Sequence, residues 1–211
     1  MSQLLLKTLR EDPADADAAG HALLVRGGYV RRLSSGVYTF LPLGWRVLHR
    51  IEQLVREELD AAGLQEMLMP ALSPLELWQE SGRAAFFGHE ALPAFTVEGR
   101  GGTFVLGPTH EEVVTVTVGA EVDSYRQLPL TVYQIQSKFR DEPRPRFGLM
   151  RTRELVMCDA YSFDVDKAAM GTSYQVVVDA YRQIFARLDL DATPVEAVSG
   201  AIGGDVNHEF M

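Results

Sequence analysis

Cysteine is almost absent from the sequence: Cys158 is the only one in 211 residues. A single thiol excludes a disulfide framework and a cysteine-based zinc site within one chain, and it fits a reducing compartment. Long apolar runs are also lacking, because no stretch approaches the roughly 20 residues that a membrane span requires. The N-terminus has three leucines between Gln3 and Lys7 but no signal-peptide core. We therefore expect a soluble, cytoplasmic protein with no membrane partner.

Positive charge is in short supply. The chain has 20 lysines and arginines against 29 aspartates and glutamates, a net charge of −9. This sign excludes binding of nucleic acid by bulk electrostatics, so any phosphate chemistry must use a local basic cluster. The content of 46% hydrophobic and 23% charged residues is that of an ordinary globular protein. It excludes collagen-like, low-complexity and wholly disordered classes.

Hydrophobic periodicity predicts a mixture of helices and strands. Apolar residues recur at three- and four-residue spacing from Val47 to Leu59, which predicts a helix that follows Gly44 and ends at Gly63. Capping boxes at Ser73 and Thr109 predict two further helix starts. Strands are expected at 64–69, 94–98, 103–106, 130–140, 149–160 and 193–198, and a last helix at 174–188. Without βαβ regularity, this order predicts an α+β domain with an antiparallel or mixed sheet flanked by helices.

The segment from Lys138 to Arg153 is the most informative. It holds six basic residues against Asp141 and Glu142, a local charge of 6 − 2 = +4. On an extended strand Arg140 and Glu142 would share one face, an arrangement that suits a nucleotide because the guanidinium binds phosphate and the carboxylate accepts from an amine or hydroxyl. A loop with two arginines and two prolines follows, and it could close over a triphosphate. A solvated hairpin with surface charges explains the same pattern.

A second candidate site lies at Gly107–Glu112. A threonine hydroxyl and a carboxylate at a helix start could hold an ammonium group. Thr109 and Glu112 also fit a capping box, which leaves Glu111 without a structural role. No protein metal site is predicted, because the five histidines lack metal-ligand spacing. Gly200–Gly204 lacks the Lys-Ser/Thr of a phosphate-binding loop. Cys158 is expected to be a small buried side chain.

Several motifs together resemble one known family. They are Leu77–Arg83, Gly107–Glu112, Tyr133–Glu142, Arg144–Gly148 and Asp159–Phe163. The chain resembles the N-terminal part of the catalytic domain of a bacterial-type prolyl-tRNA synthetase, a class II aminoacyl-tRNA synthetase. The resemblance covers essentially the whole chain.

The resemblance implies a domain organisation. Residues 1–211 would form a single partial class II catalytic domain, with motif 1 at about 44–70 and motif 2 at about 137–160. Motif 1 implies a homodimer. Motif 3, the editing insertion and the anticodon-binding domain are expected to be absent, so the sheet should be incomplete at its C-terminal end.

The resemblance also assigns site residues. Arg140 would be the catalytic residue that holds the ATP α-phosphate and the substrate carboxylate, Glu142 would lie on the adenine side, and Arg151 would bind the γ-phosphate. Leu155 stands where an aromatic ring usually stacks on adenine, a departure that should weaken ATP binding. The implied cofactors are ATP and Mg²⁺. The implied proline-binding residues are Thr109, Glu111, Arg140, Met157, Asp159 and Tyr161.

The implied function is ATP-dependent activation of proline and its ligation to tRNA(Pro), by a truncated proline--tRNA ligase that is deficient alone. Two alternatives remain open. One is a non-catalytic or regulatory paralogue that binds ATP and an amino acid or dimerises with a full-length synthetase. The other is adenylation of proline or an analogue for a carrier other than tRNA.

Overall fold

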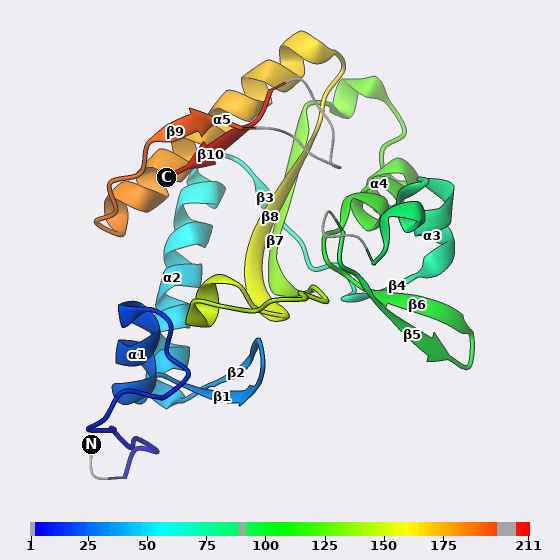
Figure 1. Cartoon of the computed structure of the whole chain (residues 1–211). Helices are drawn as coiled ribbons and strands as arrows, with labels where there is room; N and C mark the ends of the chain where they lie inside the picture. Colours follow the sequence, from blue (N-terminus) through cyan, green and yellow to red (C-terminus); the bar gives the residue numbers. More distant parts are fainter. Residues whose placement is uncertain (1–2, 89–91, 198–205) are drawn as a thin grey trace. The chain divides into compact units, whose positions relative to one another are not determined.

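A computed structural model of the chain describes residues 3–88, 92–197 and 206–211 (Figure 1). Its helices are α1 (Ala19–Arg26), α2 (Pro42–Ala61), α3 (Leu75–Glu80), α4 (Glu111–Glu121) and α5 (Lys167–Arg187). Its strands are β1 (Val30–Ser34), β2 (Val37–Phe40), β3 (Gln65–Glu66), β4 (Leu72–Pro74), β5 (Phe95–Gly99), β6 (Gly102–Leu106), β7 (Leu130–Phe139), β8 (Glu154–Phe163), β9 (Pro194–Glu196) and β10 (His208–Phe210).

The chain divides into two compact units. The first comprises Met1–Glu52, Pro70–Thr109 and Ile135–Met157, and the second comprises Gln53–Met69, His110–Gln134 and Cys158–Met211. The long elements α2, β7 and β8 therefore contribute residues to both units. One three-stranded sheet has the order β3-β7-β8, with β3 parallel to β7. The pairs β1 with β2, β4 with β6, β5 with β6 and β9 with β10 are antiparallel. The expected mixed sheet with helices is confirmed.

A small core in the first unit surrounds Trp78. The antiparallel sheet β4-β6-β5 packs against α3, and Trp78, Leu92 and Val105 are buried together. The indole N–H of Trp78 donates to Ser73 Oγ at 3.0 Å. The predicted capping box at Ser73 is wrong, because α3 begins after Pro74 with no side-chain cap. The Ser73 hydroxyl is used by the tryptophan instead.

The N-terminal half of α2 begins at Pro42, where the fixed φ of proline suits the first helical position. Gly44 faces the backbone of Tyr29, which precedes β1. A Cβ at residue 44 would lie 2.2 Å from the Tyr29 carbonyl oxygen and 2.9 Å from its carbonyl carbon. Glycine is therefore required at this close approach of helix and strand.

We expect Gly44→Ala to lower the free energy of unfolding by about 1–3 kcal/mol, because a rigid backbone must move to admit the methyl group. Chemical denaturation monitored by circular dichroism measures the change. Gly63→Ala is no suitable control because the φ of Gly63 is 87°. Gly119→Ala in α4 is the suitable control, because nothing lies within 4 Å of a Cβ added at that residue. Equal stability of Gly44→Ala and Gly119→Ala would contradict the steric argument.

The second unit is built on the C-terminal half of α2, the N-terminal half of β7 and helix α5. The phenol of the buried residue Tyr133 donates to Asp60 Oδ1 at 2.7 Å, and burial with this hydrogen bond raises the Tyr133 pKa. The Arg187 guanidinium bridges Glu57 and Glu58 at 2.6 Å each. The hairpin of β9 and β10 packs on α5 through Phe210, whose ring lies 5.3 Å from that of Phe185 (Figure 1).

No helix within the described ranges is long and apolar enough to cross a membrane. The strand expected at 193–198 is shorter, since β9 ends at Glu196, and Gly200–Gly204 lies outside the described residues.

Candidate functional site

Arg140 directly follows β7, at the point where the chain leaves the sheet. Its Nε and Nη2 lie 3.4 and 3.5 Å from the carbonyl oxygen of Pro108. The expectation that Arg140 and Glu142 share one face of a strand is wrong. The strand ends at Phe139, and the Glu142 N–H donates to the Arg140 carbonyl at 2.7 Å, a tight turn that replaces the extended geometry.

Glu142 and Arg151 form the ion pair that closes the base of the loop between β7 and β8. Arg151 Nη2 donates to Glu142 Oε1 at 2.6 Å, and the Glu142 side chain is only 10% exposed. Arg153 Nε donates to the Glu142 carbonyl at 3.1 Å. The Arg151 side chain is 41% exposed, so the pair is partly buried, and its short bond between charged groups is stronger than that of a fully exposed pair. The structure thus brings together two residues, nine positions apart, that the sequence assigned to nucleotide binding.

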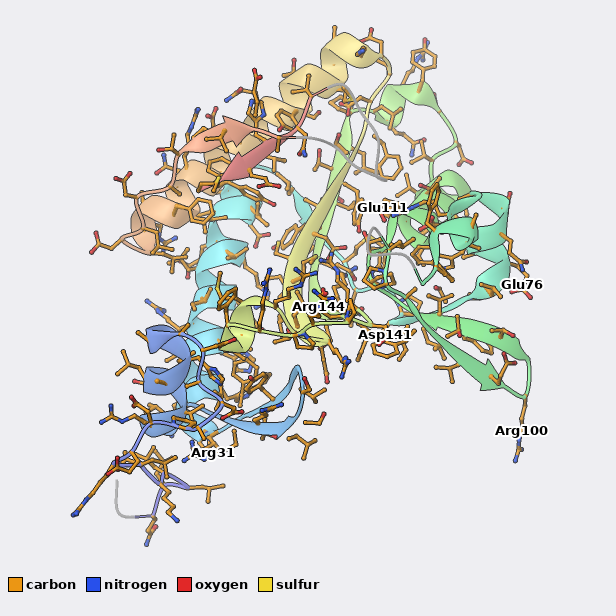
Figure 2. All side chains as sticks on the ribbon, in the orientation of Figure 1. Arg31, Glu76, Arg100, Glu111, Asp141 and Arg144 are labelled. Carbon is orange, nitrogen blue, oxygen red and sulfur yellow. The ribbon has the colours of Figure 1, made fainter. Side chains whose placement is uncertain are left out.

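The loop over residues 143–150 carries exposed Arg144 and Arg146, as the sequence predicts. Figure 2 shows Arg144 near Asp141 at this end of β7 and β8. The Arg146 guanidinium carbon lies 5.1 Å from the centre of the Phe147 ring. The loop therefore carries two positive charges and no negative charge, in a chain whose net charge is −9.

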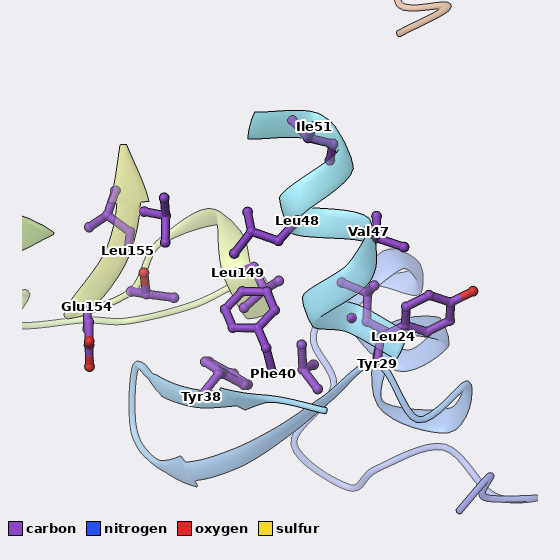
Figure 3. Close-up of a pocket in the computed structure, with 14 residues that line it drawn as sticks. Leu24, Tyr29, Tyr38, Phe40, Val47, Leu48, Ile51, Leu149, Glu154 and Leu155 are labelled. Carbon is purple, nitrogen blue, oxygen red and sulfur yellow. The ribbon is translucent and has the colours of Figure 1, made fainter. Parts of the chain in front are cut away.

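Leu155 lines an apolar cavity of about 310 Å³ in the first unit (Figure 3). The cavity lies between β2, the start of β8 and α2, where Leu48 faces it. In the synthetases that the chain resembles, an aromatic ring is expected at this position. Leu155 has no ring for stacking and instead presents an aliphatic surface to the cavity.

The second unit holds a polar network around Asp159. Tyr161 donates its hydroxyl proton to Asp159 Oδ2 at 2.5 Å, and Gln134 Nε2 donates to the same oxygen at 3.0 Å. The Tyr161 hydroxyl also accepts a hydrogen bond from the His110 N–H at 3.0 Å. Gln134 Oε1 accepts from the Met69 N–H at 3.1 Å. This network ties β8 and β7 to the residue that precedes α4.

Glu111 is the first residue of α4, and the network around Asp159 reaches its neighbour His110. A carboxylate at this position is stabilised by the helix dipole. The helix starts one residue later than the capping box at Thr109 predicts, because His110 is the cap residue of α4 and makes no side-chain cap hydrogen bond. Glu111 is therefore the first residue of the helix, and Glu112 follows it in the same first turn.

The predicted site residues belong to both compact units. The first unit contains Thr109, Arg140, Glu142, Arg151, Leu155 and Met157, and the second contains Glu111, Asp159 and Tyr161. Met157 is half-buried in β8, as is its neighbour Cys158. No group of three or more His, Cys, Asp or Glu side chains in the described ranges is arranged to hold a metal ion.

Sequence reasoning missed Gln134 and His110, which organise the network around Asp159. Gln134 is completely buried in β7. A glutamine between Tyr133 and Ile135 in a β-rich stretch was the available signal, because buried polar side chains need hydrogen-bond partners.

These features agree with one known family. Residues 95–211 match the model of the tRNA synthetase class II core domain (G, H, P, S and T), and the chain belongs to this family. Within it, the chain is similar to proline--tRNA ligases: it is 54% identical over 211 residues to that of Moorella thermoacetica and 55% identical over 210 residues to that of Pelotomaculum thermopropionicum. Both alignments cover 100% of this chain and 36% of the relative. The resemblance predicted from the motifs is confirmed.

Solved structures of prolyl-tRNA synthetases have a fold similar to that of this chain. The Giardia lamblia prolyl-tRNA synthetase in complex with prolyl-adenylate has a TM-score of 0.73 at 25% identity, over 81% of this chain and 36% of that one. The Cryptosporidium parvum enzyme complexed with L-proline and AMP has a TM-score of 0.78 at 16% identity, over 96% of this chain and 41% of that one, which supports the fold alone. The class II fold is therefore confirmed, for a chain that spans about a third of its curated relatives.

Proposed function

We propose that this chain carries the ATP and proline subsites of a proline--tRNA ligase, which activates proline with ATP and transfers it to tRNA(Pro). The observation that carries the proposal is the 54% identity to such a ligase over all 211 residues. The charges and hydrogen bonds of the two clusters described above support the roles of individual residues.

On the nucleotide side, Arg140 binds the α-phosphate and the amino-acid carboxylate. The proline carboxylate attacks the α-phosphorus, the bond to the β-phosphate oxygen breaks, and pyrophosphate leaves. Guanidinium groups lower this barrier by bringing two anions together and by stabilising charge on the phosphoryl oxygens. Glu142 accepts hydrogen bonds from the adenine side, Arg151 binds the γ-phosphate, and Leu155 contacts the base through its apolar surface. The ion pair of Glu142 with Arg151 orients both side chains.

Mg²⁺ accompanies the triphosphate in this proposal. In nucleotide sites this ion takes most of its ligands from phosphate and water and few from the protein. The absence of a ligand cluster among the described residues is compatible with that mode of binding, in which Mg²⁺ neutralises phosphate charge.

On the proline side, Glu111 binds the charged imino group. Its place at the start of α4 is ordered by the bonds from His110 to Tyr161 and from Tyr161 to Asp159. Thr109 adds a hydroxyl acceptor next to the helix start, and Met157 contributes an adaptable apolar contact for the ring. Exclusion by size discriminates by only about 1–3 kcal/mol per methylene, so alanine is expected to be accepted weakly.

The proposal includes a cytoplasmic homodimer formed through motif 1. Support comes from the apolar side chains that α2 exposes in the first unit: Trp45, Val47 and Ile51 are 47%, 45% and 38% exposed. Large exposed apolar patches of this kind are typical of protein–protein contacts.

Proline-dependent exchange of pyrophosphate into ATP, measured on the 211-residue chain with Mg²⁺, tests the proposal. Calorimetric titrations with ATP, proline and alanine accompany it. Exchange with proline would establish a minimal activating enzyme. Binding of ATP and proline without exchange would favour a binding module. A folded chain that binds neither ligand would overturn the proposal.

Replacing Glu111 tests the imino-group role. Glu111→Gln should weaken proline binding at least about tenfold, because hydrogen bonds to charged groups contribute about 1.5–3 kcal/mol. Glu121→Gln at the other end of α4 is the matched control and should leave the affinity unchanged. Unaltered preference for proline over alanine in Glu111→Gln would refute the assignment.

A further inference from the structure

The loop over residues 143–150 is attached to the N-terminal segment of its own unit. Asp17 lies two residues before α1, and its Oδ2 accepts a hydrogen bond from the Phe147 N–H at 2.7 Å. The bond joins residues 130 positions apart in the sequence. Within the loop itself, the Arg146 N–H donates to the Arg151 carbonyl at 3.2 Å.

The loop backbone is in the left-handed conformation at residues 147 and 148. Phe147 has a φ of 58°, a left-handed conformation that is uncommon for residues with a side chain. Gly148 follows with a φ of 61°, and a Cβ there would lie 2.8 Å from Cγ of the buried residue His21. The imidazole ring thus packs directly on the loop backbone. Asp17 and His21 therefore both contact the backbone of the loop at residues 147 and 148.

The hairpin of β1 and β2 holds the chain just beyond the loop. The Arg153 N–H donates to the Gly36 carbonyl at 2.8 Å, and Arg153 Nη1 donates to the Ser35 carbonyl at 3.2 Å. Ser35, Gly36 and Asp17 border a polar cavity of about 200 Å³, which Arg146 of the loop also lines. The hydrogen bond from Phe147 lowers the pKa of Asp17 below its ordinary 3.8, so the carboxylate remains an ionised acceptor at neutral pH.

We propose that Asp17 is a positioning residue for nucleotide binding: its carboxylate keeps the 143–150 loop in the shape that presents Arg144 and Arg146 to the triphosphate. Asp17 itself touches no substrate. The nucleotide part of this inference rests on the proposed function, whereas the attachment of the loop can be measured without any ligand.

Hydrogen exchange at the Phe147 amide, together with ATP titration of the 211-residue chain, tests the inference. Asp17→Ala removes the acceptor and should speed exchange at Phe147 about tenfold or more, and should weaken ATP binding roughly tenfold. Asp17→Asn keeps an oxygen acceptor and should restore most of both properties. Asp12→Ala is the matched control, because Asp12 pairs with Arg26 at 3.1 Å in the same segment, and it should change neither.

Two results would overturn the inference. One is exchange at Phe147 in Asp17→Ala that equals exchange in Asp12→Ala. The other is faster exchange with an unaltered ATP affinity, which would make Asp17 a purely structural residue. Failure of the unsubstituted chain to bind ATP would count against the proposed function and remove the nucleotide role of Asp17. The exchange data would still decide whether Asp17 holds the loop.

Discussion

Arg140→Ala is expected to lower proline-dependent ATP–pyrophosphate exchange by about 10²–10³-fold, the usual effect of removing a group that stabilises transition-state charge. Arg140 directly follows β7, and its guanidinium is near the Pro108 carbonyl, so the substitution removes charge without emptying the core. The loss should appear in kcat, because the α-phosphoryl group gains negative charge in the transition state. The affinity for ATP should also fall, because Arg140 binds the α-phosphate before the reaction.

Two variants control for this result. Arg140→Lys keeps the charge but loses the planar fork and should recover only part of the rate. Arg100→Ala removes an exposed arginine at the turn between β5 and β6 (Figure 2) and should behave as the unsubstituted chain. If Arg140→Ala bound ATP and exchanged pyrophosphate like Arg100→Ala, the motif 2 assignment would be wrong. Where the chain has no exchange activity, the same comparison is made on its affinity for ATP.

Trp78→Ala is expected to lower the free energy of unfolding by about 3–5 kcal/mol. Trp78 has no exposed surface. Its ring lies 5.4 Å from that of Phe87, and its N–H bond to Ser73 is lost with the ring. The variant thus combines a large cavity with a buried hydroxyl that has lost its partner. Chemical denaturation followed by far-ultraviolet circular dichroism, which reports the backbone and not the tryptophan, measures the change.

Phe86→Ala is the matched control, because that ring is 44% exposed in the short 3₁₀ helix that follows α3. Its loss should cost well under 1 kcal/mol, as surface substitutions usually do. Trp78→Phe should be intermediate, because it retains an apolar ring but no N–H donor. A Trp78→Ala chain as stable as Phe86→Ala would mean that this core is not needed for the fold.

Local patterns in the sequence were enough to predict much of the fold. The recurrence of apolar residues from Val47 to Leu59 predicted α2. The strands predicted at 94–98 and 103–106 correspond to β5 and β6, which pair antiparallel. Both features depend on interactions between residues that are close in the chain, where periodicity and turn chemistry are reliable. The motifs around Arg140 and Glu111 also identified the family, because they preserve residue types at fixed spacing.

Contacts between distant residues were decided only by the tertiary structure. Nothing in the local sequence shows that Asp17 accepts the Phe147 N–H or that Tyr161 binds the His110 N–H. The capping boxes also differ from the prediction: the Ser73 hydroxyl bonds the Trp78 indole, and the cap residue of α4 is His110 instead of Thr109. The sequence by itself determined the family and supplied the candidate residues for the chemistry. Their partners depend on packing, because a buried donor or acceptor bonds whatever group the fold places beside it.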